Sequence, residues 1–166
     1  LVHFLSRKAM NVIAGDATVE QMYNQSLVWN VADFYELRKE HLLMLEGWKD
    51  RAAERFLKSI EESRKVPFER VLYALGIRHV GESTAKSVAR HFGNIDAIAA
   101  ASVEDLLKVD DVGQVIAESI HDFFAFEDNK VIVARLKDAG LRFETEENLK
   151  AESDVLSGMT IVVSGN

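Results

Sequence analysis

Apolar residues recur at steps of three and four along most of the chain, which is the spacing of one face of an α-helix. Residues 50–63 show the pattern clearly, because Ala53, Phe56 and Ile60 follow one another at these steps. Strand-like alternation of apolar and polar residues is scarce before residue 155, and proline occurs once, at Pro67. The pattern predicts an all-α fold.

The helical pattern is repeated within the chain. When the sequence is shifted by 64 residues, apolar residues coincide with apolar residues over about thirty positions without a gap. The clearest coincidences are Leu42 with Leu106, Ala53 with Ala117, and Phe56 with Ile120. Self-similarity of this length predicts two copies of one structural unit.

Each copy contains two short turns that are followed at once by a helix. Residues 15, 49, 81 and 113 occupy equivalent positions in these turns, at spacings of 34, 32 and 32. A tight turn of this kind leaves the first amides of the next helix unpaired and facing one way. Such a group of N–H donors is suited to bind a phosphate. An ordinary helical bundle with glycine C-caps is the alternative.

The formal net charge of -7 at first argues against a nucleic-acid partner. Residues 1–100, however, contain 14 Lys and Arg against 13 Asp and Glu, whereas residues 101–166 contain 6 against 14. The acid is concentrated between residues 144 and 154. A local basic patch in the first hundred residues is therefore compatible with the composition.

The composition also excludes several classes of site. The chain has no cysteine, which excludes disulfides and thiolate metal sites, and its scattered histidines have no metal-ligand spacing. No run approaches the roughly 20 apolar residues of a membrane span, so we expect no membrane partner. Because the chain starts at Leu1 and stops within an apolar run, we expect a piece of a longer protein.

The turns carry a signature, apolar-x-x-apolar-Gly-x-x-x-Ala, that is typical of the helix-hairpin-helix motif. The string at residues 74–82, Ala-Leu-Gly-Ile-Arg-His-Val-Gly-Glu, resembles the third such motif of bacterial NAD-dependent DNA ligases. Further family-like strings lie, in the order of the family, at residues 3–10, 45–48, 116–120 and 136–140. Residues 156–165 resemble the first strand of the BRCT domain of these ligases, so the resemblance covers essentially the whole chain.

The resemblance implies four tandem helix-hairpin-helix motifs, arranged as two pseudo-repeats with a short C-terminal extension. We expect the first pair of motifs, with a preceding helix, in residues 1–66 and the second pair in residues 67–143. An acidic linker would follow in residues 144–155, and a truncated BRCT strand in residues 156–166.

The resemblance also implies a function, which is to hold duplex DNA independently of sequence through phosphate contacts in the minor groove. The intact ligase would seal nicks during DNA replication and repair in the bacterial cytoplasm. The Lys-x-Asp-Gly motif of the family's nucleophile does not occur in this chain, so we expect no catalytic residue and no activity of the chain alone. NAD, Mg and Zn would belong to the intact ligase, and the expected partners of a monomeric chain are nicked DNA and the ligase's other domains.

The hairpins depart from the family's usual Gly-apolar-Gly sequence. The first hairpin lacks a residue and retains Ala14-Gly15, Lys49 replaces the later glycine of the second, and Asp111 replaces the earlier glycine of the fourth. Lys49 could meet a phosphate directly, whereas Asp110 and Asp111 would repel one. We therefore rank the third hairpin first as a DNA contact, the second hairpin next, and the first and fourth last.

The candidate DNA-binding residues are those whose amides, hydroxyls or charges would face the phosphates. They are Gly47, Lys49, Arg51, Arg78, His79, Gly81, Ser83, Thr84, Lys86 and Gly113. Contacts of this kind position a protein on DNA without reading its bases. We expect Trp48, which lies within a hairpin, either to stack on DNA or to pack in the core.

Three other functions fit parts of the sequence. A helix-hairpin-helix DNA glycosylase would need a carboxylate or lysine beside a base pocket, and Asp96 and Asp105 are candidates by position alone. A protein-interaction scaffold would suit the acidic net charge. The same motifs could also belong to another DNA repair or recombination protein.

Overall fold

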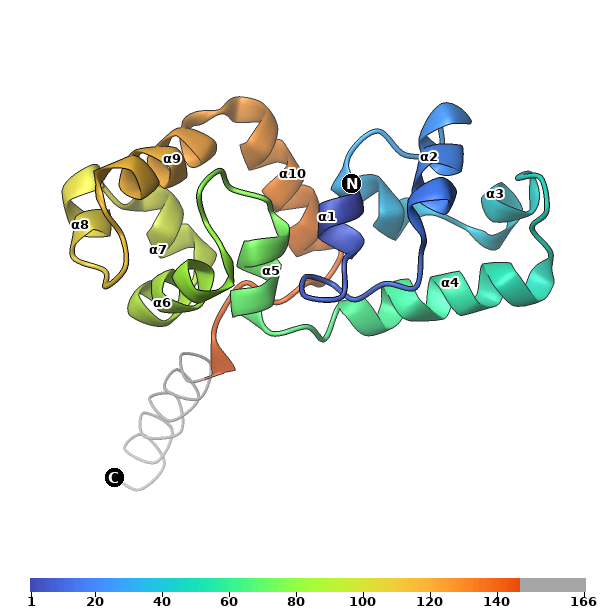
Figure 1. Ribbon diagram of the computed structural model, residues 1–166. Coiled ribbons are helices and arrows are strands. Elements are labelled where there is room, and N and C mark those ends of the chain that lie inside the picture. The colour runs from blue at the N-terminus through green and yellow to red at the C-terminus, as the bar shows by residue number, and fades with distance from the viewer. Residues whose placement is uncertain (147–166) are drawn as a thin grey trace, which may run out of the picture.

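The computed structural model describes residues 1–146, and these residues form short helices joined by tight turns (Figure 1). In chain order the helices are α1 (Val2–Leu5), α2 (Asp16–Asn24), the 3-10 helix η1 (Val31–Glu36), α3 (Lys39–Leu43), α4 (Asp50–Ser63), α5 (Phe68–Ala74), α6 (Glu82–Phe92), α7 (Ile95–Ala100), α8 (Val103–Leu107), α9 (Gln114–Ala125) and α10 (Glu127–Asp138). Residues 1–146 contain no strand, only an isolated bridge between Asn94 and Glu144. The predicted all-α fold is confirmed for the described chain.

The 64-residue repeat predicted from the sequence is present in the helices. The elements η1, α3 and α4 begin at residues 31, 39 and 50, and α7, α8 and α9 begin at residues 95, 103 and 114. Equivalent asparagines, Asn30 and Asn94, cap η1 and α7 by accepting a backbone N–H with the side-chain oxygen. The repeat therefore extends to the N-cap of the first helix in this part of each copy.

Burial follows the same register. Leu42 and Leu106 are both fully buried, and so are Ala53 and Ala117, whereas Leu43 and Leu107 are each 39 % exposed. Equivalent residues thus point in equivalent directions, which is expected when the spacing of apolar residues determines the face that a helix buries.

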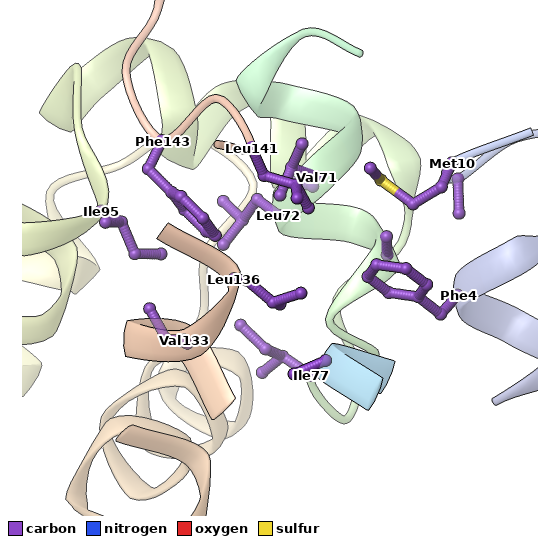
Figure 2. Close-up of a cluster of buried hydrophobic side chains, with 14 of the residues drawn as sticks. Phe4, Met10, Val71, Leu72, Ile77, Ile95, Val133, Leu136, Leu141 and Phe143 are labelled. Atoms are coloured by element: carbon purple, nitrogen blue, oxygen red, sulfur yellow. The ribbon is translucent and has the colours of Figure 1, made fainter. Parts of the chain in front are cut away.

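One continuous hydrophobic core links both pseudo-repeats. Figure 2 shows Leu136 of α10 at its centre, beside Ile77 and the α5 residue Leu72, with Phe4 of α1 close by. The segment after α10 contributes Phe143, whose ring lies 6.3 Å from that of Phe68. Because the core is continuous, the division into residues 1–66 and 67–143 stays a prediction.

Helix α10 is tied to both pseudo-repeats by ion pairs. Its Arg135 contacts Asp33 at 2.7 Å and Glu36 at 2.8 Å, both in η1, and its Lys137 pairs with Asp96 in α7. Since η1 and α7 are equivalent elements, α10 holds the same part of each copy. Most of the predicted linker at residues 144–155, and all of the predicted strand at residues 156–166, lie outside the described residues.

Candidate nucleic-acid interface

Three hairpins share a positive φ at the same position before their second helix, and hairpin three has a further positive φ at Gly76. Hairpin two (residues 44–49) joins α3 to α4, hairpin three (residues 75–81) joins α5 to α6, and hairpin four (residues 108–113) joins α8 to α9. The residue two positions before the second helix's N-cap has a positive φ in each: 83° at Gly47, 68° at His79 and 71° at Asp111. This is the position of the family's first glycine.

His79 departs from the family's usual glycine at this position, and we did not predict this departure. We ranked hairpin three first as a DNA contact and named no departure in it, but a histidine occupies its left-handed position, as Asp111 does in hairpin four. The left-handed conformation costs a non-glycine residue roughly 1–2 kcal/mol. These hairpins therefore retain the left-handed conformation at this position even where the residue, His79 or Asp111, disfavours it.

Hairpin one (residues 6–15) has a different path. Its positive φ lies at Asn11, four residues before the N-cap Gly15 of α2, and the amide of Ile13 donates to the Ser59 hydroxyl at 2.8 Å. This difference agrees with the residue that hairpin one lacks relative to the family's usual Gly-apolar-Gly sequence.

The apolar residue of each hairpin packs inward. Val80 and Val112 are buried at 8 % exposure. Trp48 is half-buried, its indole N–H donates to the side-chain oxygen of Gln21 at 3.1 Å, and its ring lies edge-on to Phe56 at 5.9 Å. Trp48 is therefore engaged in packing, which was one of the two roles expected for it.

The helices that follow the hairpins begin without a side-chain cap. Lys49, Gly81 and Gly113 are their N-caps, and none accepts a hydrogen bond with its side chain. The first helical bond of α6 runs from the Ala85 amide to the Gly81 carbonyl at 2.9 Å, and α4 and α9 begin in the same way. Within residues 1–146, the amides of the first three residues of these helices have no partner. Unpaired amides at the positive end of a helix dipole attract an anion.

The glycines of hairpins three and four face open space. A Cβ added to Gly81 or Gly113 would meet no protein atom within 4 Å. Their φ angles of -89° and -95° are ordinary for any residue. Neither packing nor backbone conformation inside the protein requires glycine at these two positions. A molecule that approaches the backbone closely from outside would require it.

The predicted basic residues are exposed and have no carboxylate partner within residues 1–146. Within the described chain no carboxylate oxygen lies within 4.0 Å of the charged nitrogens of Lys49, Arg51, Arg78 or Lys86. Ser83 is also exposed, whereas Thr84 is only partly accessible.

The basic residues after position 100 differ. Each one in the described chain pairs with a carboxylate, and these residues are Lys108, Lys130, Arg135, Lys137 and Arg142. Within residues 1–146, the lysines and arginines without a carboxylate partner thus all lie in the first hundred residues, and they include Lys49 of hairpin two and Arg78 of hairpin three.

A cleft of about 590 Å³ lies between hairpins one and two. Gly15 and Gly47 are on its walls, and the exposed Arg55 of α4 also lines it. We did not predict Arg55 as a DNA contact, although its position four residues after Arg51 places both on one face of α4. The cleft connects the two hairpins of the first pseudo-repeat.

The carboxylates proposed for a glycosylase have structural partners. Asp105 accepts the amide of Ser102 at 3.2 Å in a capping box, and this hydrogen bond is the main cause of the lowered pKa of Asp105. Asp96 pairs with Lys137. Both carboxylates already have partners within the protein, so the structure gives no support to the glycosylase alternative.

No group of three or more His, Cys, Asp or Glu residues in the described chain could hold a metal ion. No helix among residues 1–146 has the length and the apolar character needed to cross a membrane.

Comparison with known proteins places the geometry in a family context. A family model described as the helix-hairpin-helix motif matches residues 70–133, which span hairpins three and four. The chain is 48 % identical over 164 residues to a DNA ligase of Parabacteroides distasonis, and 47 % identical over 165 residues to one of Phocaeicola vulgatus. It is 46 % identical over 167 residues to a DNA ligase of Koribacter versatilis.

These matches cover 98 to 100 % of the chain but only 24 to 25 % of each relative. The chain therefore spans about a quarter of the length of the curated relatives it matches. The resemblance to DNA ligases that the sequence strings indicated is confirmed by these comparisons.

Proposed function

We propose that the chain is the part of a bacterial DNA ligase that binds duplex DNA. Nearly its whole length is homologous to a segment that makes up about a quarter of such a ligase. The complete protein would be an NAD-dependent enzyme that seals nicks in replication and repair. Its nucleotidyl-transfer chemistry, with NAD, Mg and Zn, would reside in its other domains. This chain would contribute binding, as a monomer, together with those domains.

Backbone amides make the main contacts with the DNA phosphates. The first amides of α4 and α6 bind phosphate oxygens, and Lys49, Arg51, Arg78 and Lys86 add charge around them. Ser83, in the first turn of α6, and the exposed His79, two residues before its N-cap, add further groups near the α6 amides. Hairpins that act in pairs across the minor groove would hold both strands without reading bases.

One observation carries this proposal: Gly81 and Gly113 face open space in a backbone conformation that any residue can adopt. A phosphate oxygen within hydrogen-bonding distance of the hairpin backbone would leave no room for a side chain, which explains why glycine stands at these positions. The uncapped helix starts and the unpaired cations nearby support the same ligand.

The proposal is tested by measuring the binding of the chain to a random-sequence duplex by fluorescence anisotropy at increasing salt. We expect binding that is independent of sequence and weakens with salt, by about -0.9 in log K per log salt for each neutralised phosphate. The double variant Lys49→Gln, Arg78→Gln should reduce this slope by about 1.8, since two contacts are lost.

The control variant Lys130→Gln, Arg142→Gln changes the net charge equally, but at side chains that already pair with carboxylates. It should keep the wild-type slope. Absence of measurable binding at low salt would refute the proposed function, and so would equal slopes for the two double variants.

A further inference from the structure

The outer face of α4 carries a ridge of three cations, Arg51, Arg55 and Lys58. Their spacings of four and three residues place them on one side of the helix. All three are exposed, and within residues 1–146 none has a carboxylate oxygen within 4.0 Å of its charged nitrogens. The ridge lies opposite the side that buries Phe56 and Ile60 in the core.

The carboxylates of α4 do not neutralise the ridge. Lys39 of α3 binds two of them, Asp50 at 3.6 Å and Glu54 at 2.9 Å. Arg64, which follows the helix, binds Glu61 at 3.2 Å. Glu62 is exposed one turn beyond Lys58 and marks the end of the ridge. Between residues 51 and 58, one side of α4 is therefore purely cationic.

The pseudo-repeat shows that packing does not require this ridge. In α9 the residues 64 positions later are Val115, Ser119 and Asp122, with no cation among them. The two helices nevertheless pack in the same way, with Ala53 and Ala117 both fully buried. The three charges of α4 are consequently available for a partner.

The ridge is continuous with the candidate DNA interface. It starts two residues after the N-cap Lys49, and Arg55 lines the cleft between hairpins one and two. Seven residues of helix span about 10 Å, so the ridge extends the basic surface well beyond the hairpin. In Figure 1, α4 runs along one edge of the molecule with its hairpin at one end.

We propose that the outer face of α4 is a second DNA contact, on which Arg55 and Lys58 follow the sugar-phosphate backbone after it leaves hairpin two. A linear polyanion with closely spaced charges is the partner that fits a linear row of unpaired cations. The proposal rests on the proposed function and adds to it that the first pseudo-repeat holds DNA with a helix face as well as a hairpin. The equivalent face of α9 does not take part.

The test compares the whole chain with the double variant Arg55→Gln, Lys58→Gln in salt-titrated binding to the random-sequence duplex. We expect the slope of log K against log salt to become shallower by about 1.8, because two phosphate contacts are lost. The control Lys130→Gln, Arg142→Gln should keep the wild-type slope. Circular dichroism should show unchanged helix content, since the substituted side chains are exposed.

The outcomes separate this inference from the proposed function. If the Arg55, Lys58 variant keeps the wild-type slope while the Lys49, Arg78 variant loses it, the hairpins bind DNA and the α4 contact is refuted. If the wild-type chain does not bind duplex at low salt, both proposals fail. If the α4 variant binds duplex normally but loses binding to an acidic peptide, the ridge serves a protein partner and the inference is wrong.

Discussion

At the scale of single residues, the N-cap of a helix decides whether the first amides of that helix are paired within the protein or left for an external ligand. Ser102 caps α8, and its hydroxyl accepts the amide of Asp105 at 3.1 Å. Gly81 stands at the same position of α6 and leaves the corresponding amides unpaired. A serine cap is more stabilising than glycine by a few tenths of a kcal/mol. The protein thus forgoes a small gain in stability where an external ligand could use the amides.

Gly81→Ser should therefore change stability and binding in opposite directions. A Cβ at this position meets no protein atom within 4 Å and a serine hydroxyl can cap α6, so we expect the free energy of unfolding to rise by roughly a few tenths of a kcal/mol. The same hydroxyl would accept a hydrogen bond from an α6 amide that would otherwise bind phosphate. Duplex affinity should therefore fall about tenfold, which corresponds to about 1.4 kcal/mol. Urea unfolding and anisotropy measure the two effects.

The matched variant is Gly113→Ser, which makes the same change in hairpin four. Asp110 and Asp111 are exposed next to this glycine, and we expect a smaller loss of affinity there. Equal affinity of Gly81→Ser and wild type would contradict a role for the α6 amides.

At the scale of elements, the close approach of the two helices of a motif depends on a small residue four positions after the N-cap. Ala53, Ala85 and Ala117 occupy this position in α4, α6 and α9, and each is 0 % exposed. A larger side chain there would push the second helix away from its partner. The hairpin between them would then move as well.

Ala53→Leu should destabilise the chain by about 1–3 kcal/mol, the usual effect of overpacking a core. The neighbouring Ala52 is exposed, and Ala52→Leu should change stability by no more than about 0.5 kcal/mol. Urea unfolding of both variants provides the comparison. Equal stabilities would mean that the helices of the motif tolerate a wider separation than the structure indicates.

At the scale of the whole molecule, α10 connects the two pseudo-repeats through charge as well as through the core. Asp33 is the centre of the stronger connection, since it accepts Arg135 at 2.7 Å and the amides of Trp29 and Asn30 at 2.7 and 3.0 Å. Burial by itself raises the pKa of Asp33, but these hydrogen bonds and the charge of Arg135 together lower it below the ordinary value of 3.8.

The lowered pKa predicts a specific dependence of stability on pH. Because Asp33 binds a proton more weakly in the folded than in the unfolded state, its contribution is present above about pH 3.8 and is lost as the pH falls through the folded-state pKa. Asp33→Asn should cost about 2 kcal/mol at pH 7, typical of hydrogen bonds to a charged group. The difference from wild type should shrink below pH 3.8.

The control is Asp96→Asn, which removes the exposed partner of Lys137 on the equivalent element. Exposed ion pairs contribute little, so its effect at pH 7 should be below about 1 kcal/mol. Urea unfolding at pH 7 and pH 3 distinguishes the variants. A difference between wild type and Asp33→Asn that did not change with pH would contradict the role assigned to the carboxylate.

Local features of the chain could be predicted from the sequence. The spacing of apolar residues determines which face of a helix is buried, so the helices, the 64-residue repeat and the buried Ala53, Ala85 and Ala117 followed from it. The hairpin positions followed as well, because a tight turn is specified by the few residues within it. The exposure of the predicted DNA-binding residues other than Thr84 is a consequence of the same local pattern.

Features that depend on distant residues were decided by the tertiary structure alone. The contact of Arg135 with Asp33 joins residues 102 positions apart, and the packing of Trp48 on Gln21 joins residues 27 apart. The free charge of Arg55 follows from the pairing of the neighbouring carboxylates with Lys39, outside its own helix. No periodicity encodes these partners, because they meet only after the helices have packed.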